Sequence, residues 1–130
     1  MIPKPKKEPS SSHARSKCDG LLYQCLLRRD VVCQKCGSSD NLVPSHCYGK
    51  GTWPSLRHVL LNNLLFCNDC HVWWHANIHD SWIWFVNTYR ERYDYLVIEK
   101  NQYVKLNKQH YQDTAIELEA ELKRLKREGK

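Results

Sequence analysis

The chain has 130 residues, a net charge of +6 from twenty Lys and Arg against fourteen Asp and Glu, and seven cysteines. A chain this short supports one small domain with a thin core, which usually needs disulfides, a structural metal or an oligomer for stability. No apolar run approaches the roughly 20 residues of a membrane-spanning helix, which excludes that class. The basic charge favours a partner that carries phosphates, although mildly basic domains are common.

The first segment, residues 1–16, is predicted to be a disordered basic arm. It contains three prolines, a KPKK cluster and a run of serines, a composition that buries too little apolar surface to order itself. Its charged start, broken by prolines, is unlike a secretory signal, which favours the reducing cytoplasm. In that compartment, paired cysteines are more often metal ligands than disulfides.

The next elements are expected to be short. A helix is predicted from Asp19, a candidate N-cap, to residue 30, with the apolar residues on one face. Residues 31–46 predict a strand, a cysteine knuckle and a second strand, with Gly37 supplying the positive φ that a tight CxxC turn commonly needs. Residues 47–60 contain two glycines and a proline and predict a loop.

The second half of the chain is predicted to be helical. From Cys70, apolar residues recur at helical intervals and predict a stripe that faces the core: Trp74, Ile78, Trp82, Phe85 and Tyr89. Residues 17–110 are therefore expected to form the main domain, and residues 111–130 a C-terminal helix. Its leucine seam covers only two heptads, which slightly favours a surface helix docked on its own domain over a homodimer seam or a DNA contact.

Two CxxC pairs predict one zinc site. Cys33 and Cys36 are separated from Cys67 and Cys70 by 30 residues, and the spacing within each pair lets both sulfurs reach one ion at about 2.3 Å. Four thiolates close the coordination shell, so this zinc is predicted to be structural. Two disulfides or two redox pairs are the alternative, but neither explains the histidines beside the second pair. Of the remaining cysteines, Cys25 is expected to be a small buried hydrophobe.

Histidines follow the second cysteine pair. His71 and His75 are four residues apart, so on a helix both rings point the same way and fit one divalent ion. The alternative is that this segment simply packs through its tryptophans. His79 would lie about 12 Å along the helix from His71, too far to share that ion, and is expected to face solvent or DNA.

The order CxxC, His, Asn, CxxCH resembles the HNH nuclease motif, also called the ββα-metal or His-Me finger. The match runs from the first cysteine pair to SHCYGKG with His46, NNLLF with Asn62, and CNDCH ending at His71. Asn62 keeps the family's interval of nine residues to that histidine, whereas Asn63 does not. The flanking sequences are similar to the phage NinG/Rap recombination endonucleases over roughly residues 19–125, which would place the protein in the cytoplasm of a bacterial host.

This resemblance implies an α+β fold with a small zinc-stapled ββα-metal core and flanking N-terminal and C-terminal helices. It implies hydrolysis of DNA phosphodiester bonds, with branched or junction DNA as the NinG/Rap substrate class. It makes His46 the general base, Asn62 the residue that holds the base's loop, and His71 with His75 the ligands of a catalytic Mg²⁺, Mn²⁺ or other transition-metal ion. Many HNH enzymes have Asp or His before the base as a metal ligand, but Ser45 stands there in this chain.

Two basic residues near His46 are candidate DNA ligands, and two other functions stay open. Lys50 and Arg57 lie in the predicted loop, where an arginine can hold a phosphate through two hydrogen bonds. A non-catalytic zinc module that binds nucleic acid would explain the cysteines and the charge, but not the order of His46, Asn62 and His71. An adaptor that binds proteins through the tryptophan-rich helix and the leucine seam is the other alternative.

Overall fold

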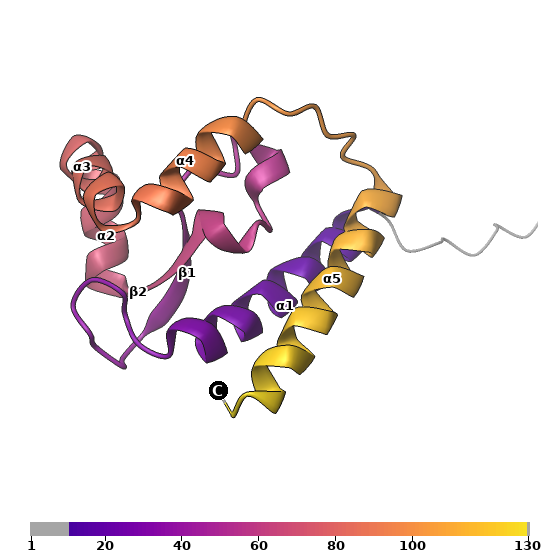
Figure 1. The fold of residues 1–130 in the computed structure, drawn as a ribbon, viewed down its shortest axis with the longest axis horizontal. Coiled ribbons are helices and arrows are strands. Elements are labelled where there is room, and N and C mark those ends of the chain that lie inside the picture. The colour runs from indigo at the N-terminus through magenta and orange to yellow at the C-terminus, as the bar shows by residue number, and fades with distance from the viewer. Residues whose placement is uncertain (1–10, 130) are drawn as a thin grey trace, which may run out of the picture.

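The computed structural model describes residues 11–129, and within them the chain forms five α-helices and a two-stranded sheet (Figure 1). The α+β class is therefore as predicted. The elements in chain order are α1 (Ser11–Asp30), β1 (Leu42–His46), β2 (Asn63–Cys67), α2 (Asn68–Ala76), α3 (Ile78–Thr88), α4 (Arg90–Glu99) and α5 (Lys108–Arg127), with 3-10 turns at Pro54–Leu56 and Leu60–Asn62.

The small sheet separates two apolar clusters. β1 and β2 are antiparallel, with Leu42 opposite Cys67 and His46 opposite Asn63, and every residue of β2 is buried. Because side chains alternate between the faces of a strand, Leu65 packs with α1 and α5, whereas its neighbours Leu64 and Phe66 pack with the aromatic residues of α2 and α3. The two faces of one strand thus bind the two halves of the molecule together.

Helices α1 and α5 lie side by side along their length (Figure 1). The predicted leucine seam of α5 is buried against α1 in one cluster with Leu22 and Leu26. The thiols of two α1 cysteines add hydrogen bonds across this contact, from Cys18 to the Tyr111 carbonyl and from Cys25 to the Leu118 carbonyl. The apolar face of α5 is therefore covered within the chain, as expected for a surface helix docked on its own domain.

Two predicted boundaries near the N-terminus are wrong. Residues 11–16, assigned to a disordered arm, form the start of α1, while residues 1–10 lie outside the described part of the chain. Asp19 is consequently in the middle of α1 and is not an N-cap. The local sequence does not show this because the contact that extends α1 comes from α5, almost a hundred residues later.

Two further predictions fail where the backbone leaves regular geometry. The strand expected before the first CxxC pair is absent from residues 31–33, where Val31 adopts a positive φ of 69° directly after α1. The long helix expected from Cys70 is interrupted at Asn77, which has φ −130° and ψ 52°. Ile78 is consequently half exposed and does not belong to the core stripe, whereas Trp74 and Phe85 are buried in it.

Candidate functional site

The four cysteines of the two CxxC pairs meet at one point. Their sulfur atoms all lie within 4.8 Å of one another, and those of Cys36 and Cys67 are 3.6 Å apart. The first pair lies in a turn closed by a hydrogen bond from the Gly37 amide to the Cys33 carbonyl, with Gly37 at φ 78° as predicted. The second pair joins the end of β2 to the first turn of α2. Residues far apart in sequence are thus brought to one candidate metal site.

The cysteine cluster fits a zinc ion. Sulfur atoms bound to zinc at 2.3 Å in a tetrahedron are about 3.8 Å apart, close to the observed separation. At Cys33, burial is outweighed by hydrogen bonds from nearby backbone amides, which lower its pKa to about 6, whereas burial and the neighbouring thiols raise the pKa of Cys70. Among residues 11–129, this is the only group of three or more Cys, His, Asp or Glu side chains arranged to hold an ion.

A second cluster is formed by Ser45 at the end of β1 and by two histidines of α2, of which His71 directly follows Cys70. The hydroxyl oxygen of Ser45 is 2.5 Å from Nδ1 of His71. The ring centroids of His71 and His75 are 4.7 Å apart, with the rings nearly perpendicular. Burial and the neighbouring His75 lower the pKa of His71, which is partly buried, whereas His75 is exposed to solvent. The structure thus brings together the predicted histidine pair and the serine that replaces the usual third ligand.

His46 is on the other face of β1. It follows Ser45 directly, so the two side chains point in opposite directions. Its Nε2 is 3.0 Å from the carbonyl oxygen of Arg57. Burial, followed by the positive charge of Lys50, lowers the pKa of His46 to about 4. The imidazole is therefore neutral at physiological pH and held in one orientation, and it is not part of the group formed by Ser45 and the helical histidines.

Asn62 clamps the loop that follows His46, the role that the resemblance implies for it. Its side chain is completely buried. The amide oxygen accepts a hydrogen bond from the Tyr48 backbone nitrogen, and the amide nitrogen donates to the carbonyl oxygens of Tyr48 and Leu56. Three hydrogen bonds from one side chain therefore fix both ends of the 48–56 segment.

Asn63 is a site residue that the sequence did not identify. Its Nδ2 donates to the carbonyl oxygens of Arg57 and Val59, and the first of these also contacts His46. Its Oδ1 is buried without a hydrogen-bond partner in the described structure. The only feature of the sequence that points to Asn63 is the pair of adjacent asparagines at the start of a buried strand. Asn62 and Asn63 together hold the backbone that orients His46.

The two basic candidates differ in their surroundings. Arg57 donates from Nε and Nη2 to the two carboxylate oxygens of Asp19, at 2.9 and 2.7 Å, and only 19% of its side chain is exposed. The guanidinium of Arg57 is therefore already paired with a carboxylate, and its predicted contact with a DNA phosphate stays a prediction. Lys50 is exposed, and it lines a hollow of about 240 Å³ together with His46.

Asp19 ties α1 to this site and was missed because only the tertiary fold brings it there. Its carboxylate also lies 2.6 Å from Nε2 of His58. Burial acts to raise the pKa of Asp19, but the hydrogen bonds from Arg57 and His58 outweigh it and lower the pKa. The charged Asp19 thus anchors the backbone segment whose carbonyl contacts His46.

Comparisons with known proteins identify no relative. No model of a protein family, no curated protein and no solved structure matches this chain. Within the described range of 11–129, no helix has the length and apolarity needed to cross a membrane. The geometry of the two clusters and of His46 is therefore the basis for a functional assignment.

Proposed function

We propose that this protein is a metal-dependent endonuclease of the HNH type that hydrolyses DNA phosphodiester bonds. The observation that carries the proposal is the state of His46. Its pKa is lowered to about 4, so the imidazole is neutral, and its Nε2 is held by the Arg57 carbonyl at the end of β1, which leaves Nδ1 for a substrate water. A general base needs this arrangement: an unprotonated, oriented nitrogen that can accept a proton.

The hydrogen bond to Arg57 fixes the tautomer of His46. Because a carbonyl oxygen only accepts, Nε2 carries the proton that is donated to Arg57, and Nδ1 keeps its lone pair. Nδ1 then takes a proton from the water that attacks phosphorus. Burial keeps the base unprotonated, and the negative charge of a bound phosphodiester raises its pKa toward the range in which a base works best.

Ser45, His71 and His75 are the residues that would hold the catalytic ion. An ion bound there supplies positive charge to the scissile phosphate and the leaving 3′ oxygen. Two imidazole ligands favour Mn²⁺, Co²⁺, Ni²⁺ or Zn²⁺ over Mg²⁺, which prefers oxygen ligands. His46 and Ser45 are neighbours at the end of β1, and the proposal places one phosphate across that end, in contact with both groups.

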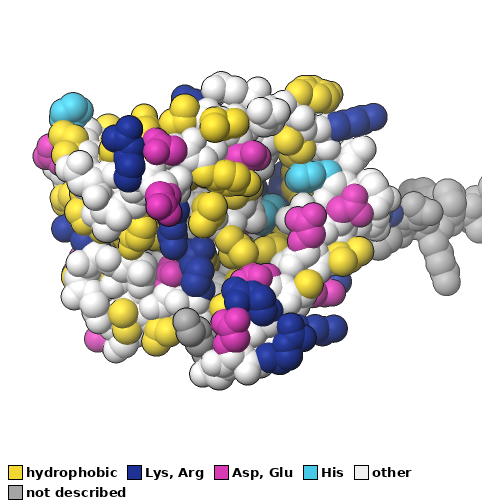
Figure 2. Space-filling model, viewed as in Figure 1, with side chains coloured by type: hydrophobic (Ala, Val, Ile, Leu, Met, Phe, Trp, Pro, Cys, Tyr) yellow, Lys and Arg dark blue, Asp and Glu magenta, His cyan; other side chains and the backbone are white. Residues whose placement is uncertain are grey.

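Charge supports DNA as the substrate. Lys50 is exposed beside His46, and Lys and Arg side chains gather over the C-terminal half of α5, interspersed with Asp and Glu (Figure 2). Such residues attract any DNA sequence and act less strongly at high salt. The resemblance to the NinG/Rap family extends the proposal to branched or junction DNA in the cytoplasm of a bacterial host.

Cleavage assays test the proposal directly. Purified protein, loaded with zinc, is incubated with supercoiled plasmid and with a four-way junction in Mn²⁺ or Mg²⁺. The native chain is expected to nick DNA at least as fast in Mn²⁺ as in Mg²⁺, and His46→Ala is expected to reduce the rate by roughly 10²–10⁴-fold. His13→Ala, at an exposed histidine of α1, is the control. Absence of nicking by the native chain, or full activity of His46→Ala, would overturn the proposal.

A non-catalytic zinc module that binds nucleic acid is the second candidate. The observation in its favour is Ser45, because a hydroxyl is a weaker metal ligand than the carboxylate or imidazole that the HNH pattern has at this position. This candidate predicts salt-dependent DNA binding without cleavage in any divalent ion. The same assays, combined with a binding titration, distinguish the two functions.

A further inference from the structure

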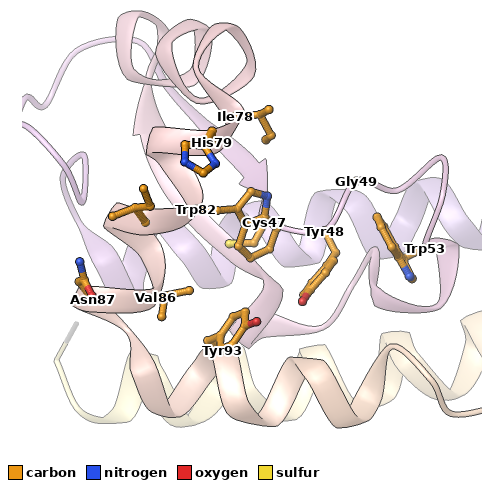
Figure 3. A pocket seen from close by; sticks show the side chains of 11 residues that line it. Cys47, Tyr48, Gly49, Trp53, Ile78, His79, Trp82, Val86, Asn87 and Tyr93 are labelled. Carbon is orange, nitrogen blue, oxygen red and sulfur yellow. The ribbon is translucent and has the colours of Figure 1, made fainter.

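An aromatic groove lies on the other side of the loop that follows His46. It encloses about 640 Å³ between residues 47–53, α3 and the start of α4, a volume within the roughly 300–1,000 Å³ of ligand pockets. Figure 3 shows Tyr48, Trp53, Trp82 and Tyr93 around it. The ring centroid of Tyr48 is 5.0 Å from that of Trp53 and 4.7 Å from that of Trp82. The groove therefore offers aromatic rings on one side and the aliphatic side chains of Ile78, Ile83 and Val86 on the α3 side.

One positive charge, that of Lys100, lies beside the rings of the groove. No Asp or Glu side chain is among its lining residues, all of which lie in the described part of the chain. The Lys100 ammonium lies 5.3 Å from the ring centroid of Tyr48 and 5.8 Å from that of Trp53. Polar groups are present at His79, Asn87 and the Tyr93 hydroxyl. A ligand that combines a flat ring, hydrogen-bonding edges and a negative charge matches this surface.

The groove is also close to the proposed catalytic base. Cys47, which lines the groove, is the residue after His46, and its backbone nitrogen donates to the Asn62 carbonyl. Lys50 lines the small hollow of His46, whereas Gly49, one residue earlier, lines the groove. A phosphate at His46 and a base in the groove would therefore lie on the two sides of one clamped loop.

We propose that this groove binds an unpaired nucleobase next to the scissile phosphate, stacked against Trp53. The assignment rests on the proposed function for the identity of the ligand as DNA, and it deepens that function by naming the substrate class. A base inside a duplex is paired and covered on both faces, so the groove selects DNA with an unpaired nucleotide. Stacking of one base on aromatic side chains contributes roughly 1–3 kcal/mol.

The test measures binding by fluorescence anisotropy without added Mn²⁺ or Mg²⁺, so that no cleavage occurs. The probes are a labelled duplex, the same duplex with a one-nucleotide bulge, and the bulged duplex with an abasic nucleotide in the bulge. The native chain is expected to bind the bulged duplex roughly tenfold more tightly than the other two, which corresponds to about 1.4 kcal/mol.

Two variants locate this preference in the groove. Trp53→Leu removes one ring, and Ile83→Glu places a carboxylate in the groove at a position that is 49% exposed, where the core is undisturbed. Both are expected to bind all three probes equally. Ile98→Glu, at an exposed position of α4 outside the groove, is the matched control and keeps the preference. Zinc content and thermal unfolding confirm that each variant is folded.

Three results would overturn the assignment: equal binding of the three probes by the native chain, an undiminished preference in Ile83→Glu, or a dimer that Ile83→Glu dissociates, because a second copy would then occupy the groove. The outcome is separable from that of the cleavage assay. If the protein prefers the bulge but does not nick DNA, the groove binds a base and the nuclease proposal is wrong. If it nicks DNA without preferring the bulge, the nuclease proposal stands and the proposal for the groove is wrong.

Discussion

Two groups of side chains meet at the start of α2, the four-cysteine cluster and the group that we propose for a catalytic ion, and they differ in how many ligands they offer. The cysteine cluster brings four sulfur atoms within 4.8 Å of one another from a turn, a strand end and a helix start. The second group has only the imidazoles of His71 and His75 with the Ser45 hydroxyl, and His75 is exposed. The first group can saturate an ion, whereas the second leaves coordination positions for water or a phosphate.

In the proposed function, this difference separates stability from reactivity. A closed four-thiolate site has no open position for a substrate, while a site with few protein ligands is the form in which metals do chemistry. The stretch from Cys67 to His75 contains two cysteines of the cluster and the two histidines of the proposed ion site. The type of residue therefore does not decide the role of a site; the number of convergent ligands and their exposure do.

The largest expected effect comes from opening the cysteine cluster. Cys67→Ser, or removal of the ion with a chelator, should unfold the domain, because a structural zinc contributes on the order of 10 kcal/mol to folding. Far-UV circular dichroism and zinc content are the measurements. Cys25→Ala, at a buried cysteine outside the cluster, should cost only about 1 kcal/mol. A metal-free chain that stays folded would show that the cluster does not stabilise the fold.

The second prediction concerns pH and His46. The folded pKa of about 4 is below the ordinary value of 6.5, so between these values the unfolded chain binds a proton that the native chain does not. Stability is therefore greatest above pH 6.5 and falls as the pH falls. From pH 7 to pH 5, the native chain should lose about 2 kcal/mol more than His46→Gln.

Urea denaturation of both proteins at the two pH values measures this difference. Protonation of the zinc ligands and of other histidines affects both proteins alike and cancels in the comparison. An equal loss of stability in the two proteins would mean that His46 is not held neutral by burial.

The third prediction adds a ligand to the open site. Ser45→Asp places a carboxylate beside His71 and should tighten Mn²⁺ binding by roughly tenfold, or about 1.4 kcal/mol. Calorimetric titration of the zinc-loaded protein measures the affinity, and a thermal unfolding curve checks that the buried position accepts the change. Ser16→Asp, on the exposed surface of α1, is the control. Unchanged Mn²⁺ affinity would argue against an ion site at Ser45.

The smallest expected effect on stability is that of His75→Ala. Because His75 is exposed, its removal should change the free energy of unfolding by no more than about 0.5 kcal/mol, while Mn²⁺ binding is lost. Trp74→Ala, on the buried side of the same helix, should instead cost about 3–5 kcal/mol. Urea denaturation and metal titration together give both readings, and a large loss of stability in His75→Ala would mark His75 as a structural residue.

Much of the local structure could be predicted because local spacing carries it. The helical period identified the apolar seam of α5, and the turn geometry of a CxxC pair identified Gly37 as a residue with positive φ. The same period wrongly predicted one continuous helix through Asn77, because a single non-helical residue interrupts the helix without changing the apolar pattern around it. The predicted start of α1 was wrong because a distant helix, α5, stabilises residues whose own composition predicts disorder.

The sequence by itself determined the four-cysteine cluster, because two CxxC pairs have few other uses in a small domain, and its resemblance to the HNH motif implied the α+β class. Only the tertiary structure decided which groups surround His46. Asp19 comes from α1 and Asn63 from β2, and both act on Arg57, a residue that the sequence offered as a DNA ligand. Hydrogen bonds between residues so far apart depend on how the helix and the sheet pack, and no local spacing encodes that.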